Sequence, residues 1–147
     1  DYLDLAWENK LATKQLKLGG QAIDLSKIAY DTYIMAGSTD HITPWRGCYR
    51  TTQLLGGKVD FVLTNQNHTQ TISNKPNKHM KYWMAPSLPA DSDEWIQQAV
   101  VYQGSWREHW IDWLKQHSGA MSTPAADLGS DAYPPLDLAP GRYVLER

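Results

Sequence analysis

The sequence contains little cysteine, no long apolar run and almost no net charge. A single cysteine among 147 residues, Cys48, excludes an internal disulfide and fits a reducing compartment. No apolar stretch approaches the roughly 20 residues needed to cross a bilayer, so we expect no membrane span. The formal net charge of −2 provides no basic surface for nucleic acid. We therefore expect a chain with the core of one domain and no nucleic-acid partner.

Metal-ligand patterns are also missing from the sequence. The histidines are His41, His68, His79, His109 and His117. None of them forms the i, i+4 pair of a helical metal site, and a single cysteine cannot form a Cys-x-x-Cys motif. We therefore expect no metal cofactor, and we interpret His41 as a packing or supporting residue. The chain begins at Asp1 and has no signal peptide, which favours a fragment or a processed chain.

The first half of the chain contains a strand, helix, strand pattern. The predicted elements are a strand over 32–36, a helix over 44–55 and a strand over 58–63. Thr43 can cap the helix, Pro44 suits its first turn, and the glycine pair at 56–57 can end it. The first strand is apolar on both faces, as in a sheet covered by helices. This βαβ pattern predicts two parallel strands and an α/β fold.

The remaining segments are predicted from turn residues and capping patterns. They are a helix over 2–13, a hairpin of 15–18 with 21–23, a loop over 64–90, helices over 91–102 and 105–117, and an extended tail over 118–147. Glycine, alanine, proline and serine dominate the tail. We therefore divide the chain into a folded part, residues 1–117, and a Pro/Gly/Ala-rich tail, residues 118–147.

Two candidate catalytic residues follow the predicted parallel strands. Asp40 comes after the first strand and His68 after the second. Because loops after neighbouring parallel strands open on the same sheet edge, we expect the two side chains to be hydrogen-bonded. An aspartate that accepts from a histidine ring orients it as a base. The alternative is a polar turn beside an ordinary loop histidine.

Cys48 is a poor candidate for a nucleophile. It lies within the predicted helix over 44–55, where the local residues do not form the G-x-S/C-x-G turn of a nucleophile elbow. Buried cysteines usually behave as small apolar residues. We therefore expect Cys48 to be chemically inert.

Three tryptophans share one face of the last predicted helix. Trp106, Trp110 and Trp113 occur at i, i+4 and i+7. We expect this face to pack on the sheet. The alternative is that it contacts an apolar substrate or product.

The longest recognisable motif is DTYIMAGSTDHITPWRGCYRTTQLLGGKVDFVL, residues 31–63. It contains Asp-His-Ile-x-Pro-Trp followed by Tyr-Arg-x-x-x-Leu-Leu-Gly-Gly, and the chain ends with Ala-Pro-Gly-Arg-Tyr-Val at 139–144. On these motifs the chain resembles the C-terminal portion of the polyhydroxyalkanoate synthases. It differs from the usual family pattern at Asn67-His68-Thr69, where the family has Gly-His-Ile.

This resemblance implies the C-terminal part of an α/β-hydrolase fold, with residues 1–117 belonging to the catalytic domain. It implies an acyltransferase that polymerises 3-hydroxyacyl-CoA into polyester and releases CoA, so that CoA thioester is substrate and no cofactor is needed. The family's catalytic aspartate and histidine match Asp40 and His68. Its cysteine lies upstream in a G-x-C-x-G motif that this chain lacks, so the chain alone is expected to be inactive.

The resemblance also implies a homodimeric enzyme located in the cytoplasm at the surface of polyhydroxyalkanoate granules. Asp40 would either orient His68 or help to deprotonate the substrate 3-hydroxyl. Two other functions are consistent with the residues alone. The chain could be a non-catalytic module for subunit or granule contact, or a small esterase-like hydrolase that uses Cys48.

Overall fold

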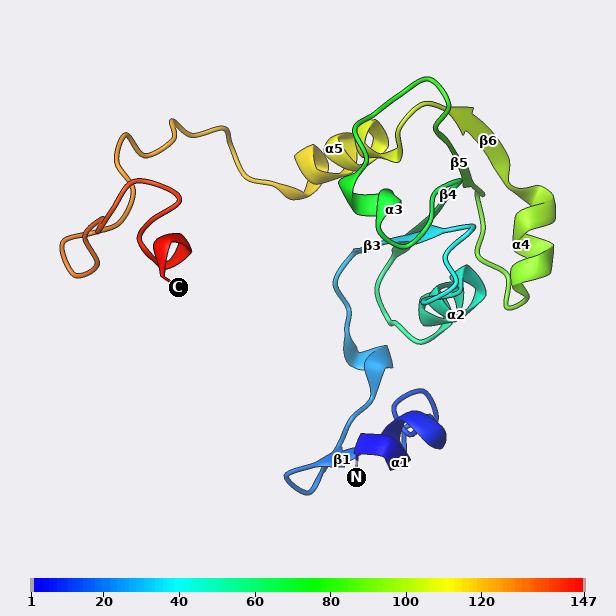
Figure 1. Ribbon diagram of the computed structural model, residues 1–147. Coiled ribbons are helices and arrows are strands. Elements are labelled where there is room, and N and C mark those ends of the chain that lie inside the picture. The colour runs from blue at the N-terminus through cyan, green and yellow to red at the C-terminus, as the bar shows by residue number, and fades with distance from the viewer. Residues whose placement is uncertain (1, 147) are drawn as a thin grey trace. The chain divides into compact units, whose positions relative to one another are not determined.

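The computed structural model describes residues 2–146 (Figure 1). The chain forms two compact units, one ending at Gln116 and one beginning at His117. The first unit contains both β-sheets and every described α-helix apart from the last residue of α5. In the second unit, beyond α5, the described residues form one short 3-10 turn, η3 (Tyr143–Leu145). None of the helices in the described residues is both long and apolar enough to span a membrane.

A four-stranded sheet is the centre of the first unit. Its strands are β3 (Thr32–Gly37), β4 (Val59–Thr64), β5 (Lys81–Met84) and β6 (Val100–Gln103), in that spatial order. β3 and β4 are parallel, with Thr32 opposite Val59 and Gly37 opposite Thr64, which confirms the predicted pair. β5 and β6 extend the sheet in antiparallel directions. The sheet therefore joins a βαβ unit to a later hairpin-like pair.

The second half of the sheet corrects the sequence prediction. Residues 64–90 were expected to be loop, yet they contain a short helix, α3 (Gln70–Ser73), and strand β5. The helix expected over 91–102 ends early: α4 spans Ser92–Gln98, and β6 follows. Each of these strands has four residues, which is too short for an alternating pattern to be distinguished from a loop or a helix end. Their pairing partners, rather than their own sequences, make them strands.

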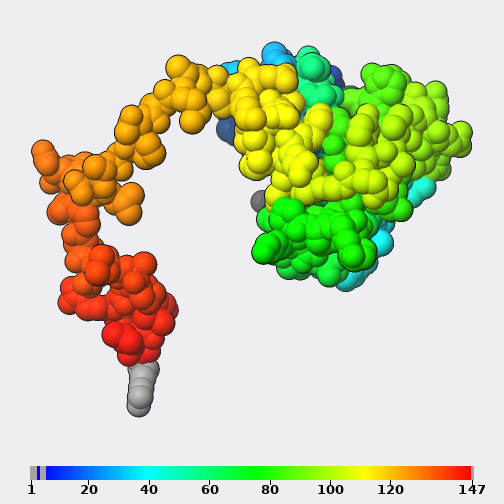
Figure 2. Space-filling model, turned by 90° about the horizontal axis from the view of Figure 1, so that it is seen from above, coloured from blue at the N-terminus to red at the C-terminus, as the bar shows by residue number. Residues whose placement is uncertain are grey.

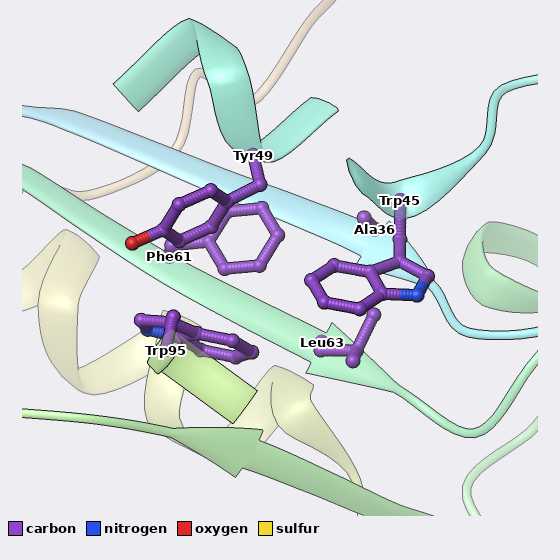
Figure 3. Close-up of a cluster of buried hydrophobic side chains, with 6 residues drawn as sticks. All are labelled: Ala36, Trp45, Tyr49, Phe61, Leu63 and Trp95. Carbon is purple, nitrogen blue, oxygen red and sulfur yellow. The ribbon is translucent and has the colours of Figure 1, made fainter. Parts of the chain in front are cut away.

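One face of the sheet carries the main apolar core (Figure 3). The buried side chains come from β3, β4 and the two helices on this face, α2 (Trp45–Arg50) and α4: Ala36, Trp45, Tyr49, Phe61, Leu63 and Trp95. The Phe61 ring meets the rings of Tyr49 and Trp95 edge to face, each with centroids 5.0 Å apart. This geometry is favourable for aromatic pairs. Phe61 therefore contacts an aromatic ring from each of the two helices.

The other face of the sheet is covered by α5 (Trp106–His117), as its tryptophan pattern predicts. Trp113 donates its indole N–H to Asp60 Oδ2 of β4 at 3.0 Å, and the Trp106 ring lies 6.4 Å from the Tyr33 ring of β3. His109 Nδ1 is 3.1 Å from the Tyr33 hydroxyl. Trp110 is 36% exposed and contacts Trp106. The packing interpretation is therefore confirmed for the two outer tryptophans.

The N-terminal segment and the crossover differ in length from the predictions. The helix expected over 2–13 is α1 (Tyr2–Trp7), followed by turns, whereas the hairpin of β1 (Lys17–Leu18) with β2 (Gln21–Ala22) is confirmed. The crossover helix expected over 44–55 ends at Arg50 and continues as one 3-10 turn, η2 (Thr51–Gln53). The glycine pair that follows lies close to the backbone of η1 (Leu25–Lys27) and of the residues after it. A Cβ on Gly57 would lie 2.2 Å from the Tyr30 carbonyl oxygen. That glycine is therefore required for close backbone approach.

We predict that Phe61→Ala lowers the free energy of unfolding by about 3–5 kcal/mol, because it leaves a cavity between the rings of Tyr49 and Trp95. The measurement is urea unfolding followed by tryptophan fluorescence at low protein concentration. Leu128→Ala, at an exposed position of the second unit, is the control and should change the free energy by less than about 0.5 kcal/mol. Equal unfolding midpoints for the two variants would contradict this account of the core.

Candidate active site at the carboxyl ends of the parallel strands

The loops after β3 and β4 bring Asp40 and His68 together, as predicted. His68 Nδ1 lies 2.9 Å from Asp40 Oδ2. The Asp40 side chain is 6% exposed, whereas that of His68 is 44% exposed. An ionised carboxylate can only accept hydrogen bonds. Nδ1 therefore carries the ring proton, and its N–H donates a hydrogen bond to Asp40. The arrangement therefore has a shielded carboxylate and an imidazole whose Nε2 is available for chemistry.

Asp40 is held by its own turn. Its Oδ1 accepts the backbone N–H groups of Ile42 and Thr43, each at 2.9 Å, and its Oδ2 accepts the Thr43 hydroxyl at 2.7 Å. Burial raises the pKa of Asp40, but the hydrogen bonds from Thr43, His68 and Ile42 outweigh it and hold the pKa well below its ordinary range. The carboxylate is therefore ionised at neutral pH and fixed in direction.

The role of Thr43 differs from the prediction. We expected this residue to cap α2, but Pro44 occupies the N-cap position and the helix start has no side-chain cap. The Thr43 hydroxyl turns back to Asp40 instead. Here the hydroxyl donates to an ionised carboxylate, and this hydrogen bond is stronger than the neutral one in which a capping hydroxyl would accept a backbone N–H, which explains the choice.

The end of β3 must pass very close to the His68 loop. A Cβ on Gly37 would lie 2.4 Å from the Gln66 carbonyl oxygen and 2.7 Å from Thr71 Oγ1. The same Gln66 carbonyl accepts the N–H of Thr39 at 3.3 Å. The sequence alone does not reveal that Gly37 is required, because this requirement depends on a loop almost thirty residues away. A glycine at the end of a strand was the one available signal.

The segment after His68 is anchored from both ends. Asn67 Oδ1 accepts the N–H of Gln70, the first residue of α3, at 2.9 Å, while the Thr71 hydroxyl donates to the Asn67 carbonyl at 2.6 Å. From α5, the Trp106 indole N–H donates to the Thr71 carbonyl at 3.1 Å, and Arg107 donates to the next carbonyl. Figure 2 shows the yellow surface of α5 against the green surface of the segment that includes α3. Thus α5 satisfies carbonyls that α3 leaves free.

A small cavity of about 180 Å³ adjoins the Asp–His pair. Its lining residues are Met35, Ala36, Gly37, Asp40, Thr43, Cys48, His68, Thr71 and Ile72. Cys48 is half-buried on α2, and its thiol lies 3.7 Å from the Thr43 carbonyl oxygen. Burial and the negative charge of Asp40 raise the pKa of the thiol. Cys48 is therefore close to the pair but poorly suited to forming a thiolate, which agrees with the prediction that it is chemically inert.

Other candidate positions do not join the pair. His41 is exposed in the turn beside Asp40. A larger cavity of about 660 Å³ lies elsewhere, between the N-terminal segment and the α2–η2 region, and is lined by Leu11, Leu25, Arg50 and Leu54 among others. Across residues 2–146 no group of three acidic, histidine or cysteine side chains is placed to hold a metal.

The fold is therefore α/β, with a hydrogen-bonded Asp–His pair at the carboxyl ends of its parallel strands. No family model matches the chain. Among curated proteins, the chain is similar to poly(3-hydroxyalkanoate) polymerase 2 of Ectopseudomonas oleovorans, with 44% identity over 133 residues. The aligned region covers 90% of this chain and 24% of that protein.

Two further relatives are also named as poly(3-hydroxyalkanoate) polymerases. Poly(3-hydroxyalkanoate) polymerase 1 of the same organism is 38% identical over 149 residues, covering 100% of this chain and 27% of the relative. The polymerase subunit PhaC of Cupriavidus necator is 36% identical, covering 88% of this chain and 22% of the relative. The chain spans about a quarter of the length of the curated relatives it matches. It is a homologue of the poly(3-hydroxyalkanoate) polymerases across most of its length, and the resemblance predicted from its motifs is confirmed.

We predict that Asp40 makes the stability of the chain depend on pH below about 5. Its pKa is lower in the folded chain than the ordinary value of about 3.9 expected when unfolded. The unfolded chain therefore binds a proton first as pH falls, and the stability present above that value is progressively lost. Asp40→Asn should unfold more easily at pH 7 and lose less stability between pH 5 and pH 3.

The measurement is urea unfolding at both pH values, followed by tryptophan fluorescence. Asp131→Asn, at an exposed position of the second unit, serves as the control and should keep the pH dependence of the original chain. Asp24, whose pKa is lowered to about 2 by hydrogen bonds from Ser26 and Lys14, should leave some acid sensitivity in every variant. An unchanged acid sensitivity in Asp40→Asn would contradict the prediction.

Proposed function

We propose that this chain is the C-terminal part of the α/β-hydrolase-type catalytic domain of a polyester synthase. The enzyme polymerises 3-hydroxyacyl-CoA into polyhydroxyalkanoate and releases CoA, with no cofactor beyond the thioester substrate. The observation that carries this proposal is the 2.9 Å hydrogen bond between His68 and Asp40 in a chain homologous to poly(3-hydroxyalkanoate) polymerases. The two residues supply the base and the acid of a Cys-His-Asp triad.

In this proposal His68 acts through its Nε2 atom. The protonated Nδ1 donates a hydrogen bond to Asp40, so Nε2 carries no proton and is an acceptor when the imidazole is neutral. It takes the thiol proton of a cysteine in the N-terminal portion of the enzyme, and the resulting thiolate attacks the thioester carbonyl. The C–S bond to CoA breaks, CoA leaves as a thiol after receiving the proton from His68, and the acyl group stays on the cysteine.

The contacts of Asp40 favour the orienting role over deprotonation of the substrate hydroxyl. Its two oxygens already accept four hydrogen bonds, and its side chain is almost fully shielded. A carboxylate with a strongly lowered pKa is also a weak base. We therefore assign to Asp40 the stabilisation of the imidazolium that His68 becomes, and to His68 the deprotonation of the incoming 3-hydroxyl.

The proposal also requires the N-terminal portion of the enzyme. Within the described residues β3 pairs with β4 alone, and its outer edge has no strand beside it. An exposed edge strand of apolar residues tends to pair with another chain. We propose that the portion carrying the nucleophile supplies the neighbouring strand and that the parent enzyme works as a homodimer.

A second candidate function, contact with an apolar surface, is supported by the second unit. It exposes large apolar side chains throughout its length: Met121, Leu128, Tyr133, Leu136, Leu138, Tyr143, Val144 and Leu145. A polyester granule presents a surface of matching character. We therefore place the parent enzyme in the cytoplasm at the granule surface, and we regard such contact as an addition to catalysis. The alternative of a small hydrolase using Cys48 is disfavoured by the raised pKa of that thiol.

We predict that His68→Ala in the full-length enzyme lowers CoA release by at least about 100-fold, because the general base is lost. His41→Ala should remain close to the original activity, since His41 is exposed and lies outside the pair. The measurement is thiol-detected CoA release from 3-hydroxybutyryl-CoA. The reverse ranking of the two variants would mean that the wrong histidine has been chosen.

We also predict that residues 1–147 alone release no CoA above background, since base and acid without a nucleophile provide no covalent route. By size-exclusion chromatography the isolated chain should be larger than its 16.7 kDa monomer, because the β3 edge is open. Addition of the N-terminal portion should restore both activity and a defined assembly. A monomeric chain with steady turnover would overturn both expectations and make Cys48 the leading nucleophile.

A further inference from the structure

Thr43 contacts the Asp–His pair through both its backbone and its side chain. Its backbone N–H reaches Asp40 Oδ1 at 2.9 Å and its hydroxyl reaches Oδ2 at 2.7 Å, so one residue binds both carboxylate oxygens. The same hydroxyl oxygen lies 3.4 Å from His68 Nδ1. Thr43 is therefore in contact with both members of the pair.

The hydroxyl restricts what each partner can do. Its single proton points to the carboxylate, so the side of the oxygen that faces His68 carries lone pairs. The ring N–H of His68 then meets two acceptors, Asp40 Oδ2 and Thr43 Oγ1, and the other tautomer would place a lone pair against both of them. This arrangement favours the tautomer whose Nε2 is free.

The sequence around Thr43 limits its own freedom as well. Pro44 follows directly and disfavours the helical backbone region for the residue before it. The β-branched side chain restricts rotation about its first torsion. The hydroxyl is thus positioned before any substrate arrives, and little entropy is lost in ordering it.

We propose that Thr43 is a positioning residue that fixes the direction of the Asp40 carboxylate and the tautomer of His68. This inference rests on the proposed function of the pair, but the contacts on which it depends do not. Thr43 has no reacting atom and transfers no proton, and it acts on the reaction through Asp40 and His68. The titratable groups that face Asp40 within the described chain are His68 from the β4 loop and Cys48 from α2.

The test compares three variants in the full-length enzyme. Thr43→Val keeps the shape and the backbone N–H but removes the hydroxyl, whereas Thr43→Ser keeps the hydroxyl. Thr39→Val removes a hydroxyl from an exposed residue of the same loop and is the control. The readouts are kcat and KM for CoA release across pH, together with a ¹³C titration of the aspartate carboxyls, in which Asp40→Asn identifies the Asp40 signal.

We expect Thr43→Val to lower kcat by about tenfold with KM unchanged, because a hydrogen bond to a charged group is lost. The acid limb of its pH profile and the carboxyl pKa of Asp40 should both move upward. Thr43→Ser should restore activity, and Thr39→Val should behave like the original enzyme. The proposal is overturned if the valine and serine variants at Thr43 lose activity alike, or if Thr43→Val matches Thr39→Val.

Two further measurements distinguish failure of this proposal from a loss of folding and from failure of the proposed function. Unfolding midpoints of all variants are compared, and a loss of activity that follows only the folded fraction also overturns the proposal. If Asp40→Asn and His68→Ala both retain full activity, the proposed function fails instead. The carboxyl titration of Thr43→Val then decides the role of Thr43 by itself: an unchanged Asp40 signal would exclude it.

Discussion

The parallel pairing of β3 with β4 is the constraint on which the rest of the structure depends. Six consecutive residue pairs, from Thr32 opposite Val59 to Gly37 opposite Thr64, end both strands at one edge. The loops that begin there carry Asp40 and His68 into contact. The same register directs Phe61 to the α2–α4 face and Asp60 to the α5 face. A slip of one residue would exchange these faces and separate the pair.

The site is an exception to the apolar character of the surrounding interior. Asp40 is almost fully shielded from water, which would be unfavourable for a charge without partners. Donors from Ile42, Thr43 and His68 satisfy both of its oxygens, and this explains the direction of its pKa. The partners are local, apart from His68. The local turn therefore prepares the carboxylate, and the tertiary fold brings the group that the carboxylate orients.

The two faces of the sheet support the Asp–His pair through different contacts. Helix α2, which begins beside the site, is fixed by aromatic packing on one face, where Phe61 meets Tyr49 and Trp95. On the opposite face α5 packs through Trp106 and Trp113, and the Trp106 indole also holds the short helix after His68. Both loops of the site are thus attached to rigid elements, as precise geometry at a reacting centre requires.

The sequence by itself determined the βαβ unit, the hairpin, the last helix and the meeting of Asp40 with His68, because these follow from local periodicity and from the rule that parallel strands end together. Tertiary structure alone decided the strand character of β5 and β6, whose four residues form strands only through pairing. It also decided the role of Thr43. A threonine before a helix can accept a backbone N–H of the first turn or turn back, and here its hydroxyl donates to the ionised carboxylate of Asp40, because a hydrogen bond to a charged group is the stronger of the two.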